Sequence, residues 1–199
     1  MLTLAFDTAA TAVSVALLNG QNVVAADGRN MERGQGEALI PMVEALLKQA
    51  GLSPADVKRV AVSVGPGSFT GVRVGLAAAR GMGLALHVPV VGITTLAAAA
   101  YQVPAETVLA VADTKRGDFF TQLFRGGRET EEPTVRTADQ IRDMGPICLT
   151  GTGADKVADY TGQPVVQNGL WPAVAVGLLA QTGGLPPNPM YLRDADVSL

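Results

Sequence analysis

One local pattern occurs twice in this sequence, about a hundred residues apart. A short apolar run ends at Asp7-Thr8, and a second one ends at Asp113-Thr114. Each is followed by an alternating stretch and a turn signal, which is Asn19-Gly20 in the first copy and Gly126-Gly127 in the second. Such runs are typical of strands, and these dipeptides favour tight hairpins. The copies align at an offset of 106 residues, which predicts a duplicated unit of strand, acidic turn and β-hairpin.

This unit, followed by alternating helices and strands, is typical of the RNase H-like fold. Two such units in tandem make the actin-like (ASKHA) architecture of actin, sugar kinases and heat-shock chaperone ATPases. We therefore predict an α/β, actin-like protein with tandem RNase H-like units, the second one truncated. The first unit spans residues 1–102, and the second, shorter unit spans 103–199 with a C-terminal tail. In enzymes of this fold the first turn approaches nucleotide phosphates, but a fold alone does not assign an activity.

The other elements follow from apolar periodicity and from turn residues. The first unit opens with strands over 2–6, 12–18 and 21–26, and the second opens with a sheet from 107 to about 135. We expect further strands at 58–64, 88–93 and 146–150, and helices at 37–50, 69–86, 95–102, 137–143, after 151–153 and at 172–182. The proline-rich segment 186–189 is expected to be extended.

A glycine-rich loop, from Gly65 to Gly75, joins strand 58–64 to helix 69–86. Glycine permits backbone angles that a Cβ would forbid, and Ser68 or Thr70 can cap the helix, whose free N–H groups favour an anion. The loop lacks the lysine and the spacing of a Walker P-loop, and it does not fit the dinucleotide fingerprint. A tight strand-to-helix turn is the alternative interpretation.

The acidic turns and this loop define a candidate remnant of a phosphate or nucleotide cleft. Its residues are Asp7, Thr8, Gly65, Gly67, Ser68, Thr70, Asp113 and Arg116. Lys115 and Arg116 can contact a phosphate of a nucleotide or of RNA. They can equally form solvated ion pairs with Asp113 and Asp118, which contribute little. The two aspartates, Asp7 and Asp113, can also be turn residues that accept hydrogen bonds from nearby backbone N–H groups.

Two helices carry more small or apolar residues than packing on one sheet requires. In helix 69–86, small residues recur every four positions, so they share a face that another backbone can approach closely. Helix 37–50 is apolar on more than one side, whereas a single stripe suffices for one sheet. The two helices either pack against each other within the monomer or form an oligomer interface. The predicted interface comprises Leu39, Ile40, Val43, Leu47, Gly71, Val72, Gly75, Ala79 and Gly83.

The sequence lacks the ingredients of most catalytic centres. His87 is the only histidine, so neither converging metal ligands nor a Ser-His-Asp or Cys-His arrangement can be assembled. Its position just before Val88-Pro89 predicts a residue at the C-terminal end of helix 69–86. Cys148 is the only cysteine, which excludes an intrachain disulfide and fits a reducing compartment. We expect no catalytic residue and no metal site.

Charge and hydropathy argue against two further classes of protein, nucleic-acid binders and membrane proteins. The formal net charge of −3 argues against a stand-alone nucleic-acid binder, which usually carries a basic patch. No apolar run is long enough to span a bilayer, and the first residues contain no positively charged leader. We therefore expect a cytoplasmic protein with no membrane attachment.

Five motifs also resemble a known family. They are Phe6-Asp7-Thr8, Leu39-Ile40-Pro41-Met42-Val43, the loop Gly65 to Gly75, the segment Asp113 to Phe119, and Tyr191-Leu192-Arg193. The sequence resembles the TsaB (YeaZ) family of bacterial tRNA threonylcarbamoyladenosine biosynthesis proteins, which was historically grouped with the glycoproteases. The loop motif is specific to this family, and the other four motifs support it.

The resemblance implies a non-catalytic partner subunit. Such a protein would bind a TsaD-type transferase, pair with itself through the two helices when alone, and work with a TsaE-type ATPase. It would meet tRNA only through the complex. It would hold no cofactor of its own, although ATP or ADP can lie at the complex interface. TsaD-type paralogues hold a metal with a His-x-x-x-His pair, but the matching residues 31–38 contain no histidine.

Two other functions compete with this one. A small actin-fold kinase or ATPase with a degenerate phosphate site is supported by the duplicated Asp-Thr turns and by the glycine-rich loop. The truncated second unit and the lack of an obvious base or magnesium cluster count against it. A glycoprotease is supported only by the historical grouping of the family.

Overall fold

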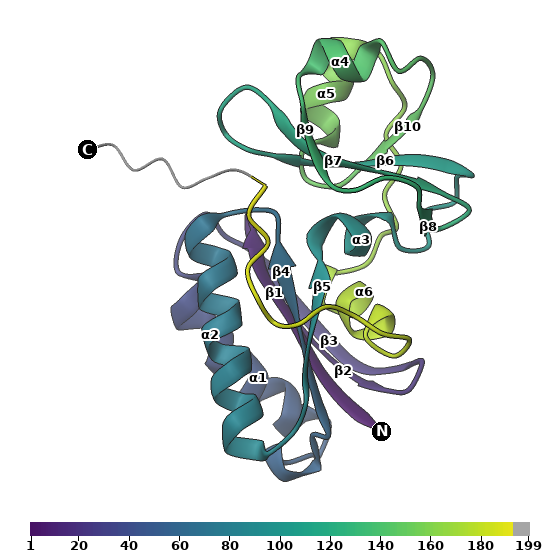
Figure 1. Ribbon diagram of the computed structural model, residues 1–199. Helices are drawn as coiled ribbons and strands as arrows, with labels where there is room; N and C mark the ends of the chain where they lie inside the picture. Colours follow the sequence, from purple (N-terminus) through teal and green to yellow (C-terminus); the bar gives the residue numbers. More distant parts are fainter. Residues whose placement is uncertain (193–199) are drawn as a thin grey trace.

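The computed structural model describes residues 1–192, which form two units, each built on one sheet (Figure 1). The first sheet contains β1 (Leu2–Ala10), β2 (Ala12–Asn19), β3 (Asn22–Asn30), β4 (Arg59–Gly65) and β5 (Val90–Thr94). Its strand order is β3-β2-β1-β4-β5. The first three strands are antiparallel, and β4 and β5 continue the sheet parallel to β1. The predicted hairpin turn lies at Gly20, whose φ of 61° favours glycine.

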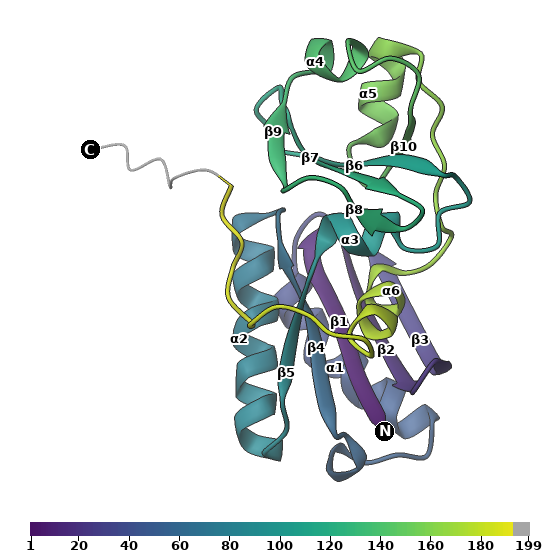
Figure 2. The same ribbon diagram turned by 45° about the vertical axis from the view of Figure 1, so that its right-hand side comes forward.

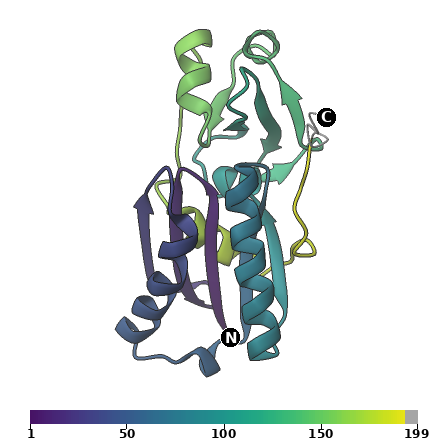
Figure 3. The ribbon, with the colours of Figure 1, turned by 90° about the vertical axis from the view of Figure 1, so that its left-hand side faces the viewer.

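Helices cover both faces of this sheet. On one face lie α1 (Gln35–Gln49) and α2 (Phe69–Leu86), side by side in Figure 3. On the other lie α3 (Thr95–Ala100) and α6 (Pro172–Leu179), shown in Figure 2. Successive strand residues point to opposite faces, so Leu4 and Phe6 pack beneath α1 and α2, whereas Ala5 packs beneath α6. A short 3-10 helix, η1 (Pro54–Asp56), precedes β4.

The second unit repeats the first in reduced form. It contains β6 (Thr107–Asp113), β7 (Phe119–Arg125), β8 (Arg128–Glu129), β9 (Thr134–Arg136), α4 (Ala138–Arg142), β10 (Cys148–Thr150) and α5 (Ala154–Thr161). Its order β10-β6-β7-β8 matches the order β4-β1-β2-β3, and β10 is parallel to β6 as β4 is to β1. Within the described residues β5 has no counterpart. The predicted α/β actin-like fold with a truncated second unit is confirmed.

The chain passes to the second unit after α3, near the predicted boundary at residue 102, but its last part does not stay there. After α5 it returns to the first unit, where α6 packs on the first sheet, with Ala173, Val174 and Ala175 in the same core cluster as Ala5 and Ala16. A helix that is apolar all round must be buried, and the free face of β1 and β2 supplies the cover. The assignment of residues from about 171 to the second unit was therefore wrong.

The tail continues along the first unit as an extended strap. Leu185 and Gly92 exchange two backbone hydrogen bonds of 2.8 Å, and the Met190 N–H donates to the Val64 carbonyl at 2.8 Å. The expected extended tail is thus present and is paired with β5. Arg193 of the Tyr191-Leu192-Arg193 motif lies outside the described residues. No helix within residues 1–192 is long and apolar enough to cross a membrane.

Candidate functional site

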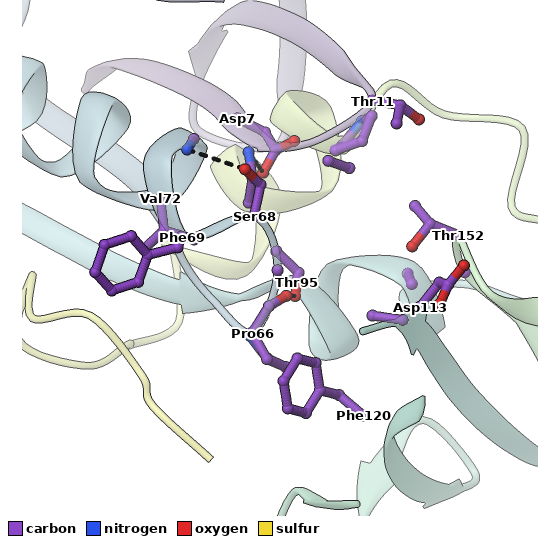
Figure 4. A pocket seen from close by; sticks show the side chains of 18 of the residues that line it. Asp7, Thr11, Pro66, Ser68, Phe69, Val72, Thr95, Asp113, Phe120 and Thr152 are labelled. Carbon is purple, nitrogen blue, oxygen red and sulfur yellow. Dashed lines mark hydrogen bonds between the residues drawn. The ribbon is translucent and has the colours of Figure 1, made fainter. Parts of the chain in front are cut away.

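A cleft of about 1610 Å³ lies between the two units. One wall consists of the β1–β2 turn, the loop before α2 and the segment that precedes α1, and the other consists of the β6–β7 turn and the loop before α5. Figure 4 shows Asp7 and Ser68 on the first side and Asp113 and Thr152 on the second. Of the eight residues predicted as a cleft remnant, all but Thr8 and Gly65 line this space.

Asp7 is buried in the C-terminal half of β1, with 1% of its surface exposed. Its carboxylate accepts a long hydrogen bond of 3.4 Å from the Ala9 N–H. Burial raises the pKa of the Asp7 carboxyl, and the Ser63 hydroxyl and the Ala9 N–H oppose this shift only in part. No ion pair joins Asp7 to a cation in the described part of the chain. The neutral form is therefore favoured more than in an ordinary aspartate.

Asp113, its counterpart in the second unit, has a different environment. Its carboxylate lies 3.3 Å from the Lys156 ammonium and 3.6 Å from that of Lys115. Partial desolvation raises its pKa, but the Lys115 N–H and the two ammonium groups outweigh this, so the pKa lies below its usual value. The duplicated aspartates thus have opposite electrostatics. Each also accepts an N–H two residues later, from Ala9 and Lys115, as expected of turn residues.

The glycine-rich loop packs directly on the β1–β2 turn. The Ser68 N–H donates to the Ala9 carbonyl at 2.7 Å, and a Cβ on Gly67 would overlap the same carbonyl. Ser68, not Thr70, caps α2, because its hydroxyl accepts the Gly71 N–H at 3.2 Å. These close approaches explain the glycines as contacts between two chain segments.

The same contacts decide how well the cleft fits a nucleotide phosphate. Two N–H groups that would face a phosphate, those of Ser68 and Gly71, already bond to protein oxygens. The ammonium groups of Lys115 and Lys156 lie beside the Asp113 carboxylate. Arg116 lines the cleft, and its backbone N–H donates to the Thr114 hydroxyl at 3.2 Å. In this arrangement, protein oxygens thus already engage these donors and cations.

Comparison with known proteins places this arrangement in a family. A family model described as "TsaD: tRNA N6-adenosine threonylcarbamoyltransferase" matches residues 29–162. The tRNA threonylcarbamoyladenosine biosynthesis protein TsaB of Escherichia coli is 39% identical over 167 residues, covering 77% of this chain and 72% of that protein. The chain belongs to the TsaB/YeaZ family. The resemblance inferred from the sequence motifs is confirmed.

Two further similarities cover nearly the whole chain. An uncharacterized protein of Mycobacterium tuberculosis is 36% identical over 199 residues, covering 97% of this chain and 92% of that protein. The solved structure of YeaZ from Pseudomonas aeruginosa superposes with a TM-score of 0.77 at 28% identity, covering 96% of this chain and 99% of that chain. The similarity to the TsaB/YeaZ family therefore extends over both units.

The segment before α1 carries none of the metal ligands implied for TsaD-type paralogues. Glu32 and Arg33 line the cleft there, and Gln35 lines it at the first position of α1, all within the stretch that matches the family model. No cluster of three or more His, Cys, Asp or Glu side chains that could hold a metal exists within residues 1–192. His87 ends α2 with a φ of 55°, at the position expected from the sequence.

The predicted helix groove of this TsaB-family chain points inward. A Cβ on Gly75 would lie 2.6 Å from the Thr8 hydroxyl and 3.3 Å from Val62, and a Cβ on Gly83 would overlap Val90. The other predicted interface residues on both helices are also buried in the core, except Ile40; these are Leu39, Val43, Leu47, Gly71, Val72 and Ala79. The prediction that these residues form an open groove was wrong, because α2 uses its glycines to lie close to its own sheet.

A different face of the same helices is open. On α2, Ala77, Gly81 and Ala85 recur every four residues and are exposed, and nothing lies within 4 Å of a Cβ placed on Gly81. Leu84 beside them is 79% exposed and Ile40 on α1 is 42% exposed. We call the exposed apolar set the outer helix face; it consists of Ile40, Pro41, Ala45, Ala77, Gly81, Leu84 and Ala85. The four-residue spacing of small residues was visible in the sequence. Which of the two stripes on α2 faces solvent was not.

Sequence reasoning also missed an aromatic group at the rim of the cleft. The Arg73 guanidinium lies 3.4 Å from the centre of the Phe69 ring, and its Nε donates to the Tyr191 hydroxyl at 3.0 Å. Phe69 and Tyr191 are each about half exposed. This stack fastens the end of the strap to the start of α2. A phenylalanine at the predicted start of helix 69–86 was the available signal in the sequence.

Proposed function

We propose that this protein is a non-catalytic partner subunit that binds a TsaD-type transferase and supports formation of threonylcarbamoyladenosine in tRNA. The observation that carries the proposal is the outer helix face on α1 and α2. Membership of the TsaB/YeaZ family supports the identity of the partner. A TsaE-type ATPase completes the proposed complex. In this proposal, tRNA reaches this chain only through that complex.

The outer helix face has the chemistry of an interface. Full burial of a leucine side chain contributes roughly 1.5–3 kcal/mol, and Leu84 has 79% of its surface available for this. Gly81, flanked by Ala77 and Ala85, leaves a shallow strip on which another helix can lie closely. Leu84 and Ile40 are exposed large apolar side chains on the two helices, and a partner that covered them would remove both from water. Because one face can pair with itself, we also propose a homodimer when the partner is absent.

A small kinase or ATPase remains the second candidate, and the size of the cleft is the observation in its favour. The engaged N–H groups of the loop and the Asp113 ion pairs count against a phosphate site. Nucleotide at an interface between this chain and its partner stays a separate proposal, because the partner would supply part of that site.

The partner proposal is tested with Gly81→Leu and Leu84→Asp, each mixed with the TsaD-type paralogue of the same organism. Overpacking of a close contact costs about 1–3 kcal/mol, so Gly81→Leu should weaken binding by roughly tenfold to a hundredfold in calorimetry. The matched control is Val23→Asp, at a 45% exposed valine on the far edge strand β3, which should bind normally. Unchanged affinity in both helix variants would contradict this interface.

A further inference from the structure

The chain passes between the two units twice. The first crossing, residues 101–106, leads from α3 to β6, and the second, residues 166–171, leads from the second unit back to α6. Figure 2 shows the second crossing descending past α3 to α6. The orientation of the units therefore depends on what joins these two segments to α3 and to each other.

Asn168, in the second crossing, joins them with its side chain. Its amide group donates to the carbonyls of Tyr101 at 2.9 Å, Ala98 at 3.1 Å and Ala99 at 3.4 Å. The last carbonyls of a helix have no partner within the helix, so Asn168 supplies donors that α3 lacks. Its oxygen accepts the Leu170 N–H at 3.0 Å, which fixes the side chain to its own crossing. One residue thus holds the end of α3, the start of the first crossing and the second crossing.

The neighbouring residue holds the other unit. The Gln167 side chain accepts the Gly151 N–H and donates to the Gly151 carbonyl, both at 3.3 Å. The Thr150 hydroxyl lies 3.2 Å from the Gln167 oxygen and 3.3 Å from the Ala99 carbonyl of α3. Gln167 and Asn168 both line the cleft. These two consecutive side chains therefore bond to opposite walls of the cleft: Gln167 bonds to the second unit, and Asn168 bonds to the end of α3 in the first unit.

Apolar packing also joins the two units at this point. The contact between α3 and the second sheet is a small apolar cluster of Leu96, Ala100, Ala110, Ala112 and Phe124. Because apolar packing is not directional, elements in such a contact can shift relative to each other. The far end of the second crossing is anchored, because the Trp171 ring covers Gly28 of β3 so closely that a Cβ there would overlap it.

We propose that the side-chain amide of Asn168 holds the two crossings together at the hinge. It thereby sets how far the cleft between the two units opens. Without the amide donors, the carbonyl oxygens of Ala98 and Tyr101 lose this partner, the Ala99 carbonyl keeps only the Thr150 hydroxyl, and the two crossings can separate. The units then rotate about residues 101–106 and 166–171, and the cleft occupies a wider range of openings. This role of Asn168 lies within the chain itself and does not require the proposed function.

The test uses Asn168→Asp, which keeps the shape and the acceptor for Leu170 but cannot donate to the three carbonyls. Spin labels are placed on exposed positions of the two units, with Lys48→Cys and Asp159→Cys in a Cys148→Ser background. Pulsed electron paramagnetic resonance should give one narrow population of distances between the two spin labels in the parent chain. Asn168→Asp should add a second population at longer distance.

Gln163→Glu is the matched control, because it makes the same amide-to-acid change. The Gln163 amide donates to the Gly145 carbonyl at 2.6 Å and so bonds only within the second unit. This control should keep a single distance population. A folded Asn168→Asp chain with unchanged distances, or equal broadening in Gln163→Glu, overturns the proposal. Should Asn168→Asp fail to fold, Asn168→Ala decides, since it removes the same amide donors without introducing a charge; unchanged distances there also overturn the proposal.

Discussion

The Thr8 hydroxyl donates a hydrogen bond of 2.7 Å to the carbonyl of Gly71, a residue 63 positions later in the chain. The bond joins the end of β1 to the first turn of α2, and both residues are buried. A Cβ on Gly71 would overlap the Thr8 carbonyl, so α2 can lie this close to β1 only with glycine at that position. The family's glycine-rich motif is in this chain a device for helix–sheet packing.

Thr8→Val should lower the free energy of unfolding by about 1 kcal/mol, because it keeps the shape of the side chain and removes a buried hydrogen bond. Urea unfolding of the isolated protein measures this. Thr130→Val is the control, since Thr130 donates a similar bond of 3.0 Å to the Leu123 carbonyl at an exposed position. Equal losses in the two variants would show that the Thr8–Gly71 bond has no special weight.

Gly75→Ala and Gly81→Ala should change stability in opposite directions, although both replace a glycine in α2. The new methyl group at position 75 would meet the Thr8 hydroxyl at 2.6 Å, and overpacking costs about 1–3 kcal/mol. The methyl group at position 81 enters open space, so the higher helix propensity of alanine should stabilise by up to about 1 kcal/mol. Melting temperatures of dilute protein compare the two, and a gain at both positions would contradict the inward orientation of Gly75.

Asp7→Asn should flatten part of the pH dependence of stability. The raised pKa of Asp7 means that the folded protein holds this proton more tightly, so stability falls as pH rises from 3.8 through the folded pKa. Asparagine does not titrate, so the variant does not lose stability in this way as the pH rises. Unfolding in urea at a series of pH values should therefore show the variant gaining on the parent chain toward neutral pH. A constant difference across the series would refute it.

Asp113→Asn should show the reverse trend. Its pKa is lowered in the folded protein, so its contribution is fully present above 3.8 and is lost as pH falls through the lower folded value. The variant should thus be less stable than the parent at neutral pH and converge with it in acid. High salt should shrink the difference, because Lys115 and Lys156 are more than half exposed. A difference that grew in acid would rule out the assigned sign.

Local pattern was enough to predict most elements of this protein. The alternation and turn signals at Asn19-Gly20 and Gly126-Gly127 predicted both hairpins, and α2 begins at Phe69 and ends at Leu86 as expected. Ser68 and His87 mark those ends because caps depend on neighbouring residues only. The duplication, and with it the fold, was visible because each copy of the strand–Asp–hairpin pattern repeats the same short-range signals.

Long-range packing decided the rest. In α2 two stripes of small residues run in parallel, one through Gly75 and one through Gly81, and periodicity gives their spacing but not which of them meets the sheet. An all-apolar helix such as α6 has no stripe to show which unit it joins. Asn168 reaches carbonyls 67 to 70 residues away, and no local signal marks such a bond. These features depend on which segments the folded chain brings together, and that information is absent from any short window of sequence.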